Sequence, residues 1–125
     1  MMKKTVCVDM DAVLARYDGW HGVEVIGNPI PGAVEFTRTL SEIAEVVIFT
    51  TRCNPEINKP EKAHLLRNRV AQWLDKHGFA YADIYIGVGK PIASAYVDDR
   101  AVICRPQDDD GAYDHALNRV KTLLG

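Results

Sequence analysis

The sequence predicts an α/β domain, a three-layer α/β/α sandwich with a mainly parallel sheet, that takes in residues 1–125 as one unit. Three observations lead to this fold class. Short apolar runs rich in β-branched residues alternate with segments of helical periodicity, which is typical of parallel sheets covered by helices. A length of 125 residues suits one hydrophobic core. No internal repeat, low-complexity tract or linker divides the chain.

The first expected elements are a strand, a helix and a second strand. Residues 5–8 form a short run of β-branched residues and cysteine, as in strands buried on both faces, and the run stops at Asp9. A helix of about three turns is expected from Pro31, because proline suits a first helical turn. Apolar residues recur there at roughly helical spacing: Val34, Phe36, Leu40 and Ile43. Residues 46–49 form the second buried strand.

The clearest helix lies in the middle of the chain. Asn58 can cap it, Pro60 and Glu61 fit its first turn, and Gly78 stands where a left-handed stop is expected. Its apolar residues share one face: Leu66, Val70, Trp73 and Leu74.

The last third of the chain predicts further strands and a final helix. Strands are expected at residues 84–86 and 95–97, with a short edge strand at 101–103. The helix is expected from about Ala112 to Leu124, with Asp110 as its cap. Four of its apolar residues are expected to turn inward: Ala116, Leu117, Val120 and Leu124.

Composition excludes several classes of protein. Apolar residues make up 47% and charged residues 26%, as in ordinary globular domains, and a net charge of −2 argues against a strongly basic nucleic-acid binder. The apolar stretches are far shorter than the roughly 20 residues that span a bilayer, so we expect no membrane contact and a cytoplasmic protein. Three cysteines without a C-x-x-C pair favour reduced thiols over disulfides or zinc.

Polar residues follow three of the expected strands directly. Ligands bind at the carboxyl ends of parallel strands, so these residues are expected to share one site. Four carboxylates there would repel one another unless a divalent cation neutralised them, and oxygen ligands without histidine favour Mg²⁺. A lysine and hydroxyl groups beside such a metal make a phosphate-binding set. The residues are Asp9, Asp11, Thr50, Thr51, Lys90, Asp98 and Asp99.

These residues resemble the four motifs of the haloacid dehalogenase superfamily, in the right order. Residues 6–14 look like the hydrophobic strand with Asp-x-Asp, residues 47–50 like the second motif, Lys90 with Pro91 like the third, and residues 96–99 like the fourth. The chain is most similar to small phosphatase-like members and to the deoxyribonucleotidase-like branch. The resemblance implies a Rossmann-like sheet. One departure is Ala12, where glycine is commonest in the family.

A folded cap domain, which many members of this superfamily carry, has no room here. Only about 34 residues separate Asp11 from Val46, and they must also supply a helix. Residues 15–28 can form only a flap or hairpin over the site. In that flap Trp20 and His21 are candidate substrate contacts, and Arg52 is a candidate for gripping a second anionic group of the substrate, with a surface ion pair as the alternative.

The resemblance also implies roles for the acids. Asp9 would be the nucleophile that forms an aspartyl-phosphate, and Asp11 the general acid and base. Magnesium would be held by Asp9, the backbone carbonyl of Asp11 and Asp98, with Asp99 further out or on a metal-bound water. Asp98 and Asp99 are adjacent, so we expect their carboxylates to point apart if strand geometry continues.

The resemblance implies phosphate contacts from the hydroxyl of Thr50, with Thr51 beside it, and charge balance from Lys90. The expected activity is magnesium-dependent hydrolysis of a phosphomonoester, with a nucleotide or another phosphorylated metabolite as substrate. An uncapped site also permits a nucleic-acid end or a phosphoprotein, or a homo-oligomer that covers the site. Two further alternatives are a non-catalytic module that kept the fold and phosphoryl transfer to an acceptor other than water.

Overall fold

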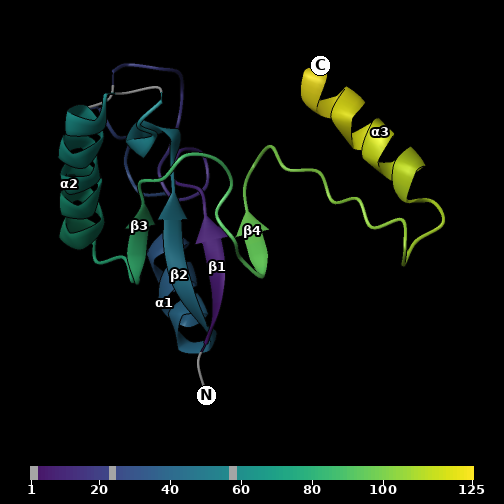
Figure 1. Ribbon diagram of the computed structural model, residues 1–125, viewed down its shortest axis with the longest axis horizontal. Coiled ribbons are helices and arrows are strands. Elements are labelled where there is room, and N and C mark those ends of the chain that lie inside the picture. Colours follow the sequence, from purple (N-terminus) through teal and green to yellow (C-terminus); the bar gives the residue numbers. More distant parts are fainter. Residues whose placement is uncertain (1–2, 23–24, 57–58) are drawn as a thin grey trace.

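A computed structural model describes residues 3–22, 25–56 and 59–125, and it contains one four-stranded parallel sheet (Figure 1). Its strand order is β3-β2-β1-β4, with β1 and β2 in the centre. Along the chain the strands are β1 (Lys4–Val8), β2 (Ala44–Phe49), β3 (Asp83–Tyr85) and β4 (Ala95–Val97). All four agree with the expected strands to within two residues at either end. The expected edge strand at 101–103 is wrong, because the chain bends after β4 and leaves the sheet.

Three α-helices and one 3₁₀ turn join or follow the strands. They are α1 (Ala33–Ile43), η1 (Thr51–Cys53), α2 (Pro60–His77) and α3 (Ala112–Leu124). Helix α2 is as predicted and ends at Gly78, whose φ of 80° gives the left-handed stop. Its expected cap, Asn58, lies outside the described residues.

The starts of α1 and α3 differ from the prediction. Helix α1 begins after Gly32, whose φ of 90° sets the chain direction, so Pro31 lies in the preceding turn. Helix α3 is preceded by Gly111, and Asp109, not Asp110, accepts a hydrogen bond from the Gly111 amide at 2.9 Å. The carboxylate two residues before the glycine is the one that reaches this amide.

One face of the sheet carries the core. Val8, Val46, Ile48 and Ile84 lie in register on this face and are nearly inaccessible to water. They pack against Val70 and Leu74 of α2 and against Met10 and Leu14, which follow β1. Burial of these apolar side chains holds the ends of the central strands in place.

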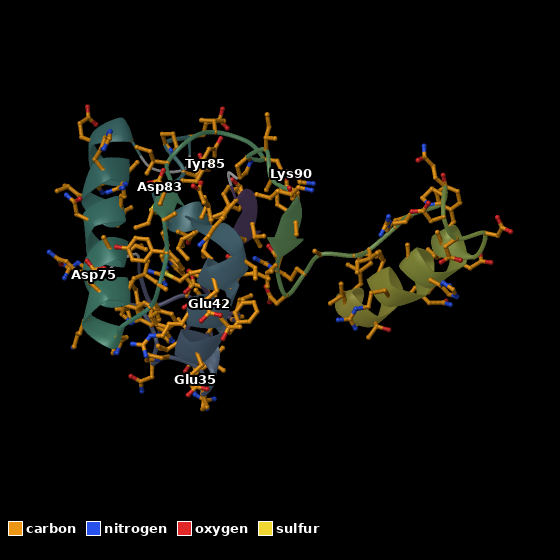
Figure 2. All side chains as sticks on the ribbon, turned by 90° about the horizontal axis from the view of Figure 1, so that it is seen from below. Glu35, Glu42, Asp75, Asp83, Tyr85 and Lys90 are labelled. Atoms are coloured by element: carbon orange, nitrogen blue, oxygen red, sulfur yellow. The ribbon has the colours of Figure 1, made fainter. Side chains whose placement is uncertain are left out.

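The α/β class with a parallel sheet is confirmed, and the described residues between β1 and β2 hold no cap domain. The third layer is incomplete. Helix α3 stands apart from the sheet beyond β4 in both views (Figures 1 and 2), and three of the residues expected to turn inward are exposed: Leu117, Val120 and Leu124. No described helix is long and apolar enough to cross a membrane.

Candidate active site

Three carboxylates meet where β1 and β4 end. The backbone amide of Asp9 donates to the carbonyl of Val97 at 2.9 Å, which ties the two strand ends together. One carboxylate oxygen from each of Asp9, Asp98 and Asp99 lies within 4.8 Å of the others. We call these three residues the acidic cluster. The expectation that Asp98 and Asp99 point apart is wrong, because β4 ends at Val97 and a bend replaces strand geometry.

Asp9 is the most perturbed acid of the cluster. Burial, with a smaller contribution from the negative charges of Asp98, Asp99 and Asp11, raises its pKa from 3.8 to about 7, although a hydrogen bond from the Met10 amide lowers it. That amide donates to Asp9 Oδ1 at 2.8 Å. Repulsion and lost hydration therefore disfavour the charged form of Asp9 until a cation arrives.

The donor set fits a hard divalent cation. Three carboxylate oxygens converge at a spacing that one ion can bridge, and two of the three residues are exposed to water that can complete the shell. Histidine and cysteine are absent from this group, so Mg²⁺ suits it better than Zn²⁺.

Asp11 forms a two-fold ion pair with Arg52. Arg52 Nε donates to Oδ2 at 2.9 Å and Nη2 donates to Oδ1 at 3.1 Å. The Arg52 side chain is only 3% exposed and that of Asp11 is 19% exposed, so the pair is largely shielded from water. Two parallel hydrogen bonds fix the plane of the Asp11 carboxylate as well as its position.

Arg52 also holds the flap of residues 15–28. Its guanidinium donates to the carbonyl of Val25 at 2.9 Å and lies 5.1 Å from the centre of the Trp20 ring. The ion pair expected as the alternative role of Arg52 is therefore present, but it is buried and not at the surface. A contact of Arg52 with a second anionic group of the substrate stays a prediction. Its sequence position beside Thr50 and Thr51 gave no sign that it would turn inward.

A cleft of about 240 Å³ opens beside the acidic cluster. Two aromatic residues of the flap, Tyr17 and Trp20, line it together with Asp9, Asp11 and Thr51. Phe49 and Arg100 also line it, and neither was predicted from the sequence, whereas Tyr17 belongs to the segment that was predicted to form a flap over the site. Arg100 directly follows the Asp98-Asp99 pair, which was the available signal.

The remaining predicted residues fall into different places. Thr51 faces the cleft, whereas Thr50 is buried and its Oγ1 accepts from the Arg52 amide at 3.3 Å. Lys90 lines a neighbouring hollow that shares Asp9 and Asp98 with the cleft, and its Nζ lies 4.3 Å from the centre of the Tyr96 ring. His21 is exposed, pairs with Asp18 at 3.0 Å and does not line the cleft.

A tight turn directly after β1 carries Asp11. Ala12 has a φ of 68°, the left-handed region that favours glycine. Its amide donates to the carbonyl of Ala15 at 2.8 Å, and the amide of Leu14 donates to that of Met10 at 2.8 Å. The alanine at a position where the resembled family has glycine is therefore accommodated with backbone strain.

Comparison with solved structures gives two similar folds. One is a structural-genomics target from Vibrio cholerae, 28% identical, with a TM-score of 0.55 over 84% of this chain and 85% of that one. The other is a D,D-heptose 1,7-bisphosphate phosphatase from B. bronchiseptica, crystallised with magnesium and phosphate, 18% identical, with a TM-score of 0.44 over 94% of this chain and 64% of that one. No protein-family model and no curated protein matches the chain.

The haloacid dehalogenase-like fold predicted from the motifs agrees with the observed sheet. The first and fourth motifs end on adjacent strands β1 and β4, and the second ends on β2, on the other side of β1. All three place their polar residues at the same edge, as the fold requires.

Proposed function

We propose that this chain is a magnesium-dependent phosphomonoester hydrolase of the haloacid dehalogenase superfamily that works through an aspartyl-phosphate on Asp9. One observation carries the proposal: beside the same cleft as the acidic cluster lies a separate carboxylate, that of Asp11, whose plane is fixed by Arg52. A nucleophile and a separately held proton carrier are what the two halves of this reaction need.

Asp9, Asp98 and Asp99 would hold the cation, with Asp11 contributing its backbone carbonyl. When bound, Mg²⁺ would neutralise the cluster and polarise the phosphoryl oxygens. Burial, together with the charges of the neighbouring acids, raises the pKa of Asp9 to about 7, so its charged form is disfavoured without this neutralisation.

In the first half-reaction an Asp9 carboxylate oxygen attacks phosphorus, and the bond from phosphorus to the ester oxygen breaks. Asp11 gives its proton to that leaving oxygen. In the second half-reaction Asp11 takes a proton from water, the water oxygen attacks phosphorus, and the bond to Asp9 breaks to release phosphate and the free carboxylate. Arg52 acts as a positioning residue that keeps Asp11 aligned through both steps.

Three polar residues would bind the phosphoryl group. Thr51 and Arg100 line the cleft itself, and Lys90 lines the neighbouring hollow, which Asp9 and Asp98 also line. Thr50 supports the turn that presents Thr51. Positive charge and a hydroxyl donor beside the acids suit a tetrahedral anion.

The aromatic side chains of Tyr17, Trp20 and Phe49 favour a nucleotide or a related phosphorylated metabolite as the substrate. Planar bases stack on such rings, each stacked base contributing about 1–3 kcal/mol. A nucleic-acid end or a phosphoprotein is the alternative substrate for an uncapped site.

The proposal is tested by assaying phosphate release from p-nitrophenyl phosphate and from a panel of nucleoside monophosphates. We expect turnover that requires Mg²⁺ and disappears in excess EDTA and in Asp9→Asn. Full turnover in EDTA would rule out the metal, and wild-type rates in folded Asp9→Asn would rule out the nucleophile. A folded protein that binds nucleotides without turnover would instead indicate the non-catalytic module.

A further inference from the structure

The face of the sheet opposite the core is not covered by any helix of the described residues. Because register partners point the same way, this face is formed by Cys7, Val47, Phe49, Tyr85 and Tyr96, which we call the open face. Figure 2 shows Tyr85 and Lys90 on the opposite side of the sheet from Glu35 and Glu42 of α1. Tyr96 is 39% exposed and Val47, Phe49 and Tyr85 are half-buried, whereas Cys7 in the middle of the face is buried beside a hollow that residues 101–103 also line. Sheets of parallel strands are normally covered by helices on both faces.

Helix α3 has a matching apolar side without a packing partner. Its spacing places Tyr113, Leu117, Val120, Leu123 and Leu124 on one side of the helix, and all five are exposed. Leu117 is 54% exposed. An amphipathic helix of this length is marginal in water unless its apolar side is buried.

Residues 98–111 connect β4 to α3, and we call this segment the arm. Within this arm Arg105 pairs with Asp108 at 2.7 Å, and Asp109 pairs with His115 of the helix at 3.3 Å. Ala112 is buried at the junction of arm and helix. Helix α3 lies beyond the edge of β4, away from its own sheet (Figure 1).

We propose that two copies of this chain exchange their α3 helices, each helix packing on the open face of the other copy. One such dimer covers both open faces and both apolar helix sides with surfaces that the chain already contains. Exchange suits this chain because the arm already projects the helix outward.

Charge complementarity sets the direction of packing. A helix that covers the open face is expected to run antiparallel to the strands. The C-terminal end of α3 then lies at the amino ends of the strands. Arg119 and Lys121 flank the apolar side of α3, while Glu45 lies at the amino end of β2 on the open face. Asp83, at the amino end of β3 on the same face, already pairs with Arg67 of its own chain. The opposite charges therefore meet in this orientation.

The first experiment measures molar mass by light scattering over a dilution series. We expect wild type to be a dimer and both Val120→Asp and Tyr96→Asp to be monomers, because each buries a charge in the proposed contact. Asn118→Asp, on the opposite side of α3, is the matched control and should remain dimeric. A monomeric wild type, or a dimeric Val120→Asp, overturns the proposal.

The second experiment distinguishes exchange from other dimers. Tyr96→Asp and Val120→Asp chains with different tags are co-expressed, and one tag is captured. Exchange predicts a mixed dimer, because the intact helix of the Tyr96→Asp chain can pack on the intact open face of the Val120→Asp chain. Two Val120→Asp chains together should form no dimer. Failure to capture the mixed dimer overturns exchange. A monomeric wild type whose melting temperature falls in Val120→Asp would show α3 folding back on its own sheet.

Discussion

Arg52 donates two hydrogen bonds to Asp11, from Nε to Oδ2 at 2.9 Å and from Nη2 to Oδ1 at 3.1 Å, across 41 residues of sequence. The same guanidinium contacts the backbone carbonyl of Val25 and the ring of Trp20. The buried guanidinium of Arg52 thus connects Asp11, the proposed proton carrier, with the flap that lines the cleft. A change at Arg52 is expected to disturb both.

Arg52→Lys should lower kcat about 100-fold with a smaller change in KM, because lysine keeps the charge but cannot make two parallel hydrogen bonds to one carboxylate. Steady-state kinetics with a nucleoside monophosphate as substrate measures kcat and KM separately. Arg67→Lys is the matched control, since Arg67 pairs with Asp83 at the surface and should behave as wild type. An equal loss in both variants would contradict a positioning role for Arg52.

Asp9→Asn should raise the melting temperature in metal-free buffer at about pH 8. The folded-state pKa of Asp9 is raised from 3.8 to about 7, so between these values the folded protein binds more protons than the unfolded one. Its free energy of unfolding therefore falls as pH rises through this window and stays lower above it. Asparagine at this position removes this loss of stability. The gain in melting temperature over wild type should therefore shrink toward pH 4.

Thermal melts across pH in EDTA measure this effect, with Asp110→Asn as the control because Asp110 is an exposed acid outside the cluster. A gain for Asp9→Asn that is independent of pH would mean that repulsion and burial of this carboxylate are not its cause.

Asp98→Asn and Asp99→Asn should both raise the Mg²⁺ concentration needed for half-maximal activity, by about 10-fold or more. Both carboxylates reach the cluster, and the Arg100 amide donates to Asp98 Oδ1 at 2.8 Å, which orients this side chain. We expect the larger effect at Asp98. Magnesium titrations of both variants decide the order, with Asp108→Asn as a control for loss of an exposed charge; a larger effect at Asp99 would reverse the assignment.

Ala12→Gly should stabilise the protein by up to about 1 kcal/mol, because an L-residue at positive φ costs about 1–2 kcal/mol and part of the gain is offset by the freer unfolded chain. The melting temperature should rise by a few degrees. Ala95→Gly, in a strand, should instead lower it. Equal shifts in the two variants would show that the backbone at Ala12 is not strained.

The strands and α2 could be predicted because apolar runs and helical spacing record burial directly. The acids at the strand ends could be predicted for the same reason: each directly follows a buried run. The direction of Arg52 could not, since its partners Asp11, Trp20 and Val25 come from a distant turn and flap. The placement of α3 could not either, because its amphipathic pattern requires a partner surface without specifying which chain supplies it.

The pairing of β1 with β4 has a consequence for the order of folding. Val6 pairs with Val46 of β2 and with Ala95 of β4, so the second pairing closes a loop that takes in most of the chain. Contacts between distant parts of a chain form late. We therefore expect Asp98 and Asp99 to join Asp9 only in the last stage of sheet assembly. A nascent chain that ends before β4 would have neither the mutual repulsion of these acids nor a binding site for a cation. Divalent ions would consequently accelerate only the final refolding phase and leave the earlier β1–β2 step unchanged.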